Sequence, residues 1–148
     1  MKRIVLIFAF LMIGMTVYSQ SGYVDLGLPS GTLWKTQNEY GSYTYDKAMN
    51  DFGNSVPSSE QWKELIDNCK WTKTEKGFKI TGTNGNVIFL TANGCVDCYS
   101  EKWEGVYYWT STINPNGGAF SCESFQNSVM IGAYRECYKM SVRLVKKP

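Results

Sequence analysis

The chain has 148 residues with 15 Lys or Arg, 13 Asp or Glu and no histidine. This length fits one domain, and the lack of histidine excludes Ser-His-Asp and Cys-His catalytic groups, the usual zinc sites and the commonest general base near neutral pH. The positive excess is due entirely to Lys2 and Arg3, so residues 20–148 carry no net charge and present no clustered basic sequence for nucleic-acid binding.

The N-terminal segment is typical of an export signal. Two basic residues precede an apolar run, 4–17, whose length of about 14 residues falls short of the ~20 that span a bilayer. Val17-Tyr18-Ser19 then resembles a signal-peptidase site. We therefore expect residues 1–19 to be a cleaved signal peptide and residues 20–148 to form a single exported domain without a stable membrane span. The domain would be periplasmic, cell-surface or secreted; a retained N-terminal anchor is the alternative.

The first half of the domain is predicted to contain short extended segments and then helices. Residues 23–28 and 32–37 are expected to be extended, separated by a Pro-Ser-Gly turn, and residues 45–52 favour a short helix. Ser58 is a good N-cap, and Gln61 three residues later completes a capping box. Apolar residues then recur at helical spacing, which predicts a helix with one buried face. These residues are Trp62, Leu65, Ile66 and Cys69.

The second half is predicted to be mostly strands. Phe78 and Ile80 alternate with polar residues, and Asn84-Gly85 is a strong hairpin signal. Residues 87–90 are almost wholly apolar, which predicts a strand buried on both faces. Further strands are predicted at 106–112, 119–125, 129–133 and 140–145. The layout is α+β, with one or two helices packed on a curved, mainly antiparallel sheet.

Five sequence blocks carry a resemblance to a known family. They are YVDLGLPSGTLW (23–34), VPSSEQWKELIDNCKW (56–71), GFKITGTNGNVIFLTANG (77–94), YYWTST (107–112) and SVRLV (141–145). Their order resembles the Fibrobacter succinogenes major paralogous domain family of secreted bacterial modules, over nearly all of residues 23–146. The resemblance implies a C-type-lectin-like fold, similar also to formylglycine-generating enzymes, in which terminal strands pair and a variable loop region displays ligand contacts. The short 39–54 segment departs from longer members of the family and leaves less surface on that side.

The resemblance places the variable loop at residues 93–105. Tyr99 and Trp103 lie there among polar residues, and Asn114 and Asn116 lie in a turn expected beside it. Exposed rings there would stack on a sugar or anchor a protein contact, and the two amides would add hydrogen bonds. The alternative for Trp103 is that its ring covers the sheet edge. We therefore predict a non-catalytic binding module of the bacterial envelope whose partner is a glycan or an envelope or host protein.

The cysteine content leaves other functions open. Cys95, Cys98, Cys122 and Cys137 are expected to form up to two disulfide bonds in an oxidising compartment, with Cys69 packed as a free thiol. The Cys95–Cys98 spacing allows a cysteine-based oxidoreductase as an alternative. A carboxylate hydrolase and a purely structural envelope protein are the remaining alternatives.

No metal or other cofactor is expected. One CxxC motif is a weak zinc signal, and Asn114-Pro115-Asn116 lacks the carboxylates of a calcium-dependent sugar site. Arg143 alternates with Val142 and Leu144, so it is expected to face solvent or to form a structural ion pair, and a ligand contact is the alternative.

Overall fold

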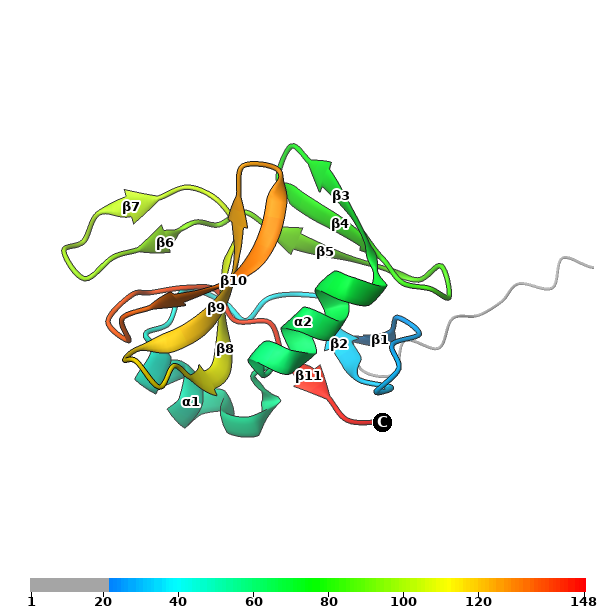
Figure 1. The fold of residues 1–148 in the computed structure, drawn as a ribbon, viewed down its shortest axis with the longest axis horizontal. Helices are drawn as coiled ribbons and strands as arrows, with labels where there is room; N and C mark the ends of the chain where they lie inside the picture. The colour runs from blue at the N-terminus through cyan, green and yellow to red at the C-terminus, as the bar shows by residue number, and fades with distance from the viewer. Residues whose placement is uncertain (1–21) are drawn as a thin grey trace, which may run out of the picture.

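The computed structural model describes residues 22–148, and the signal peptide expected at residues 1–19 lies outside them. The architecture is α+β, as predicted, with antiparallel strand pairing throughout the named sheets. The strands form three separate three-stranded sheets and one two-stranded arm (Figure 1), where one curved sheet was expected. Within residues 22–148, no helix has the length and apolar character needed to cross a membrane.

The first sheet joins the two ends of the described chain. It contains β1 (Tyr23–Asp25), β2 (Leu33–Lys35) and β11 (Val145–Lys146), with β2 in the middle. Trp34 of β2 pairs with Val24 on one side and with Val145 on the other, and its side chain is fully buried. Both ends are thus fixed to the core through the same tryptophan-bearing strand.

The two helices follow the local sequence signals. Helix α1 (Tyr45–Phe52) ends at Gly53, whose φ of 49° favours glycine, and a 3₁₀ turn η1 (Gly53–Ser55) follows. Helix α2 (Ser59–Asn68) begins with the predicted capping box: the Gln61 amide donates to the Ser58 hydroxyl at 3.1 Å, and the Ser58 amide donates to Gln61 Oε1 at 2.9 Å. Both helices contact the sheet formed by β8 (Tyr107–Ile113), β9 (Ala119–Phe125) and β10 (Ser128–Tyr134).

The third sheet contains β3 (Lys70–Thr74), β4 (Gly77–Thr81) and β5 (Val87–Thr91). The predicted Asn84-Gly85 turn connects β4 to β5, with the Gly82 amide donating to the Asn86 carbonyl at 2.8 Å. The prediction that residues 87–90 are buried on both faces is wrong. The outer face of this sheet is uncovered: Phe89, which is 55% exposed, pairs with Lys79 of β4, which is also exposed.

Two further predictions require correction. Residues 93–105, expected to be a loop, contain the small arm formed by β6 (Cys95–Val96) and β7 (Lys102–Trp103), which projects from the body in Figure 1. Residues 140–145 were expected to form one strand. Instead, Met140 and Ser141 make single bridges to Tyr43 and Tyr108, and regular pairing begins only at Val145. The chain there is extended but alternates between partners.

The core divides into two apolar clusters. The first surrounds α2 and includes Trp34 and Trp62, whose ring centroids are 4.7 Å apart. The second surrounds α1 and includes Trp109. The Trp62 indole donates to the Trp109 carbonyl at 3.3 Å and so links the two clusters.

Candidate ligand-binding groove

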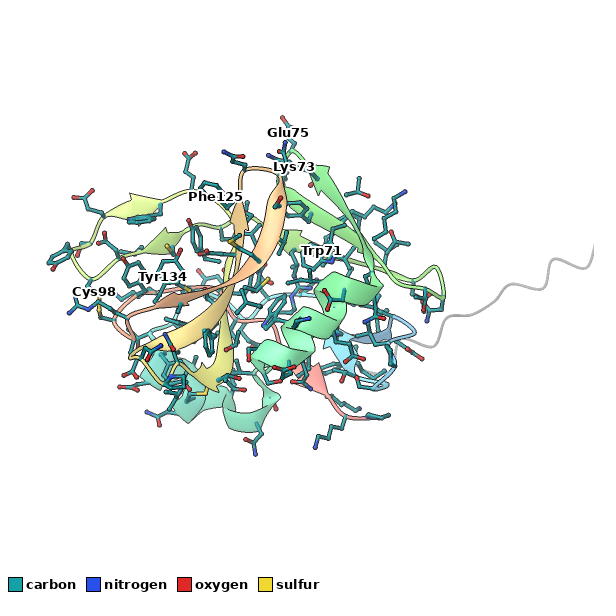
Figure 2. All side chains as sticks on the ribbon, viewed as in Figure 1. Trp71, Lys73, Glu75, Cys98, Phe125 and Tyr134 are labelled. Atoms are coloured by element: carbon teal, nitrogen blue, oxygen red, sulfur yellow. A yellow bond between two sulfur atoms is a disulfide. The ribbon has the colours of Figure 1, made fainter. Side chains whose placement is uncertain are left out.

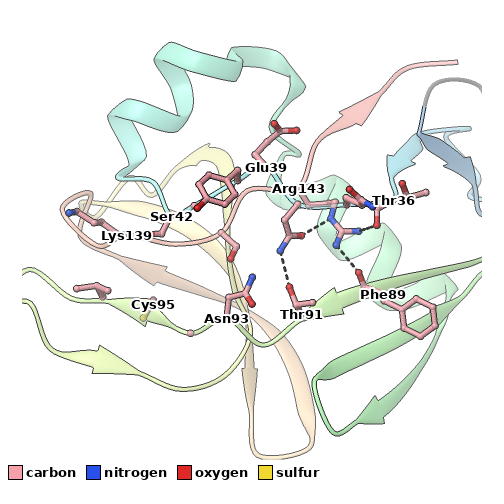
Figure 3. Close-up of a pocket in the computed structure, with 16 residues that line it drawn as sticks. Thr36, Glu39, Ser42, Phe89, Thr91, Asn93, Cys95, Lys139 and Arg143 are labelled. Atoms are coloured by element: carbon pink, nitrogen blue, oxygen red, sulfur yellow. Dashed lines mark hydrogen bonds between the residues drawn. The ribbon is translucent and has the colours of Figure 1, made fainter.

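An open groove of about 650 Å³ lies between three segments that are far apart in the sequence (Figure 3). One wall is the 36–42 segment after β2, and the opposite wall is the connection from β5 to β6. The C-terminal residues 139–143 form the floor. The groove therefore lies on the side of the molecule where the short 39–54 segment was expected to leave less surface than in longer family members.

Backbone hydrogen bonds fix the first wall to the floor. The amides of Lys35, Glu39 and Tyr43 donate to carbonyls of the 140–144 segment at 2.8–2.9 Å. The opposite wall is tied to the floor by reciprocal bonds between Val96 and Lys139, at 2.8 and 3.0 Å. The groove is therefore a fixed feature of the backbone.

The floor residues alternate between core and groove. Met140, Val142 and Leu144 belong to the second apolar cluster, whereas Lys139, Ser141 and Arg143 line the groove. This alternation is the pattern expected of an extended chain with one apolar face.

Arg143 connects the two walls. Its side chain donates to Asn38 Oδ1 at 2.8 Å, to the carbonyls of Lys35 and Thr36 at 3.0 and 3.2 Å, and to the Phe89 carbonyl at 2.7 Å. Figure 3 shows the guanidinium between Thr36 and Phe89. Arg143 is only 2% exposed, and burial lowers its pKa from the ordinary value, opposed by the nearby Tyr108 hydroxyl. The expectation that it faces solvent or forms an ion pair is wrong: within residues 22–148 its partners are carbonyl and amide oxygens.

A polar network extends from Arg143 beneath the groove. Asn38 donates from Nδ2 to Thr91 Oγ1 at 2.9 Å and accepts at Oδ1 from the Tyr108 hydroxyl at 3.0 Å. The Thr91 amide donates to the same Tyr108 hydroxyl at 3.1 Å. Both ends of the Asn38 amide group are therefore held, which fixes the orientation of the polar floor.

Two aromatic residues, Tyr40 and Phe89, lie among the groove-lining residues on opposite walls. Tyr40 is 98% exposed and Phe89 is 55% exposed. The Tyr43 hydroxyl donates to the Tyr40 carbonyl at 2.6 Å, which fixes the backbone that presents the first ring. Ser42 and Asn93 add a hydroxyl and an amide. Exposed rings beside fixed hydrogen-bonding groups are suited to a ligand with both apolar faces and hydroxyl groups.

Charge in the groove is limited. Glu39 is the one carboxylate among the lining residues, all of which lie in the described part of the chain, and it forms an ion pair with Lys35 at 2.5 Å. General acid–base hydrolysis of glycosides uses two carboxylates flanking the bond to be cleaved. The groove thus has the groups for binding and lacks that catalytic pair.

The predicted contact residues Tyr99 and Trp103 lie on the β6–β7 arm, outside this groove. Tyr99 is 80% exposed. Trp103 is 43% exposed: its indole donates to Asp97 Oδ2 at 3.1 Å, and its ring meets Tyr138 edge-on at a centroid distance of 6.2 Å. Part of the Trp103 ring is therefore used in packing, and the rest is free.

The predicted residues Asn114 and Asn116 lie in the β8–β9 turn, where Asn114 Oδ1 accepts from the Asn116 amide at 3.2 Å. Asn116 lines a shallow depression together with Cys137, which is disulfide-bonded to Cys98 of the arm. The disulfide therefore brings the arm close to this turn. Tyr99 and Trp103 on the arm and Asn116 on the turn are exposed, whereas Asn114 is half-buried.

Tyr40, Phe89 and Asn38 line the groove but were not predicted as contact residues from the sequence. Tyr40 stands in the polar run Asn38-Glu39-Tyr40-Gly41-Ser42, which was a signal for an exposed ring. Phe89 stands between Ile88 and Leu90, and strict alternation would have placed it on the outer face. Neither signal indicates that the two rings share one groove.

The cysteines form one disulfide bond, Cys98–Cys137, with a Cα–Cα distance of 5.2 Å. Cys69, Cys95 and Cys122 are thiols. Cys95 is buried, and burial together with Asp97 and Glu123 raises its pKa to about 11. A redox CxxC motif requires its own two sulfurs to form the exchangeable bond, so this arrangement does not favour the oxidoreductase hypothesis.

Comparison with known proteins finds no matching family model, no similar curated protein and no similar solved structure. Residues 22–148 also contain no cluster of three or more His, Cys, Asp or Glu side chains that could hold a metal ion. Function is therefore inferred from the groove and from the residues that shape it.

Proposed function

We propose that the protein is an exported, non-catalytic binding module with a C-type-lectin-like fold, and that its groove binds a glycan. One observation carries the proposal: Tyr40 and Phe89, two residues with exposed aromatic side chains, belong to opposite walls of an open groove above a polar floor that Arg143 holds in place. A sugar ring offers an apolar C–H face to an aromatic side chain and hydroxyl groups to amides and carbonyls. An open groove suits a segment of a longer saccharide.

The arrangement of the chain ends supports the fold assignment. The resemblance implies that the terminal strands pair, and β11 pairs with β2 in the sheet that also contains β1. A disulfide bond is compatible with export, because such bonds persist in oxidising compartments. Both points are consistent with a secreted bacterial module.

The test is a binding screen of the purified protein against bacterial and host glycans, followed by titration calorimetry with the best ligand. Phe89→Ala and Tyr40→Ala are each expected to weaken binding about tenfold or more, because each removes a central aromatic contact. Both side chains are exposed, so the melting temperature should change by only a few degrees.

Two exposed aromatic residues outside the groove provide matched controls. Phe125 is 62% exposed at the end of β9, and Tyr99 is 80% exposed on the arm. Alanine at Phe125 should leave binding unchanged. Loss of binding on Tyr99→Ala, with Phe89→Ala inactive, would move the site to the arm and to Trp103. Failure to bind any glycan, with capture of an envelope or host protein, would replace the glycan by a protein ligand.

A further inference from the structure

The sheet that carries Phe89 is basic. Strands β3, β4 and β5 contain Lys70, Lys73 and Lys79, and none of these three strands contains an Asp or a Glu. Glu75 belongs to the turn between β3 and β4, and it lies with Lys73 at that end of the sheet (Figure 2). The strands therefore present positive charge beside the groove.

Lys79 is the lysine next to the groove wall. It pairs with Phe89 in the antiparallel register of β4 and β5, and both side chains are exposed on the uncovered outer face of the sheet. Residues directly opposite each other in such a pair have Cβ atoms about 4.5–5.5 Å apart. Lys79 therefore lies beside an aromatic residue that lines the groove. Within residues 22–148, Lys79 forms no ion pair.

The groove itself carries a positive charge that no acid balances. Its charged lining residues are Glu39, Lys139 and Arg143. Glu39 already has a partner, because its carboxylate pairs with Lys35 at 2.5 Å. Arg143 is buried, and within the described part of the chain its hydrogen bonds go to carbonyl and amide oxygens and to no carboxylate. A buried cation without a counter-ion favours a negative charge in whatever binds above it.

The positive charges gather toward the Phe89 end of the groove. Figure 3 shows Lys139 and Phe89 at opposite ends, with the Arg143 guanidinium nearer to Phe89. Arg143 donates to the Phe89 carbonyl at 2.7 Å, so its charge lies beneath the same strand. This end of the groove therefore combines an exposed aromatic side chain, an exposed lysine and a buried guanidinium.

We propose that the groove binds an acidic glycan, and that Lys79 binds the anionic group of the sugar ring that packs against Phe89. This inference rests on the proposed glycan binding and specifies the class of ligand. A sugar that bears a carboxylate or a sulfate offers a C–H face to the phenyl ring and an anion to the adjacent ammonium group. The buried charge of Arg143 favours the same anion from beneath the groove.

The charge pattern suits a saccharide with few acidic groups. A nucleic acid carries a charge on every phosphate and is contacted by a clustered basic face. Here the two exposed lysines, Lys79 and Lys139, belong to opposite ends of the groove. The spacing therefore favours an acidic saccharide segment over a polyphosphate.

The test compares matched ligands by titration calorimetry. Oligogalacturonate and its methyl ester share one backbone and differ in the carboxylate charge, and a sulfated oligosaccharide with its desulfated form is the second pair. In at least one pair, the acidic member should bind about fivefold or more tightly at low salt, and this advantage should shrink as salt screens the charges. The pair that shows the advantage identifies the anion as a carboxylate or a sulfate.

Lys79→Gln removes the charge beside Phe89 and keeps a side chain of similar length. It should reduce the advantage of the acidic ligand to about twofold or less and leave the affinity for the neutral form unchanged. Lys63→Gln is the matched control, because Lys63 is an exposed lysine of α2 that does not line this groove, and it should change neither affinity. Both lysines are exposed, so neither variant should unfold the protein.

Equal affinity for the acidic and neutral forms would overturn this inference and leave glycan binding in place. An acidic preference that survives Lys79→Gln and disappears on Lys139→Gln would put the anion at the opposite end of the groove, which also overturns it. An equal loss on Lys63→Gln would mean that only the overall charge of the protein matters. If no glycan binds, acidic or neutral, the proposed function fails together with this inference.

Discussion

Replacing Arg143 with lysine tests how the groove is held in shape. The guanidinium donates to four acceptors on two walls: the Asn38 side chain and the carbonyls of Lys35, Thr36 and Phe89. Lysine keeps the charge but has a compact head with three donors, and it cannot reproduce the planar fork. We expect about two of the four acceptors to lose their partner.

The cost follows from burial. An unpaired buried acceptor costs about 1–3 kcal/mol, so two of them should lower the free energy of unfolding by roughly 2–6 kcal/mol. For a domain of this size, about 3–5 °C in melting temperature corresponds to 1 kcal/mol, so the expected drop is roughly 6–30 °C. The expected loss of free energy is a large part of the ~5–15 kcal/mol that stabilises a typical domain.

Thermal and urea unfolding of Arg143→Lys and Arg135→Lys provide the measurement. Arg135 is exposed, so the same substitution there should cost less than about 0.5 kcal/mol. A loss below about 1 kcal/mol for Arg143→Lys would refute the reasoning, because it would mean that the four hydrogen bonds do not hold the walls together. Reduced glycan affinity should accompany the loss, since Phe89 is one of the four partners.

Three further predictions concern the cysteines and the arm. Burial raises the pKa of Cys95 to about 11 from an ordinary value of 9, so the thiol stays neutral in the folded protein at pH 9. The neutral thiol therefore stabilises the folded state below pH 9, and this stabilisation is lost as the pH rises from 9 to 11. Unfolding at pH 8 and near pH 10.5 should show this decline, and Cys95→Ser should make it smaller; an equally steep decline would contradict burial as its cause. Reduction of the Cys98–Cys137 disulfide should lower the free energy of unfolding by about 2–4 kcal/mol. Peptide mapping of the unreduced, denatured protein should find that only these two cysteines resist alkylation, whereas a Cys95–Cys98 disulfide would contradict the structure. Trp103→Ala removes the hydrogen bond to Asp97 and the ring contact with Tyr138, so it should lower the free energy of unfolding by roughly 1–2 kcal/mol and leave glycan binding unchanged. Loss of binding without loss of stability would instead place the site on the arm.

The elements that could be predicted from the sequence are those specified by neighbouring residues. The Ser58–Gln61 capping box defines the start of α2, and Asn84-Gly85 defines the β4–β5 turn. Strand β3 was missed because its sequence, Lys-Trp-Thr-Lys-Thr, has little apolar alternation, and pairing with β4 makes it a strand. Strand β5 was assigned two buried faces because an apolar run does not reveal that the outer face of the sheet is left uncovered.

The candidate site could not be predicted because it depends on contacts between distant segments. Arg143 and Asn38 are 105 positions apart, Arg143 and Phe89 are 54 apart, and Asn38 and Thr91 are 53 apart. Sequence alternation correctly separates Arg143 from its core neighbours Val142 and Leu144, but it does not show that the outer face is covered. Burial there depends on the 36–42 wall, which lies against the C-terminal segment only in the folded chain.

The burial of Arg143 bears directly on how the groove would bind. A guanidinium held under a groove by backbone carbonyls is costly to desolvate, and its hydrogen bonds connect both walls before any ligand arrives. A site whose shape is already fixed loses little conformational entropy on binding, so more of the contact energy contributes to affinity. Tyr40, at 98% exposure, stands at the rim as the part that is free to adjust. If the groove binds a saccharide as proposed, a fixed floor with an adjustable ring above it would favour recognition of one saccharide shape and tolerate variation in what extends beyond the groove.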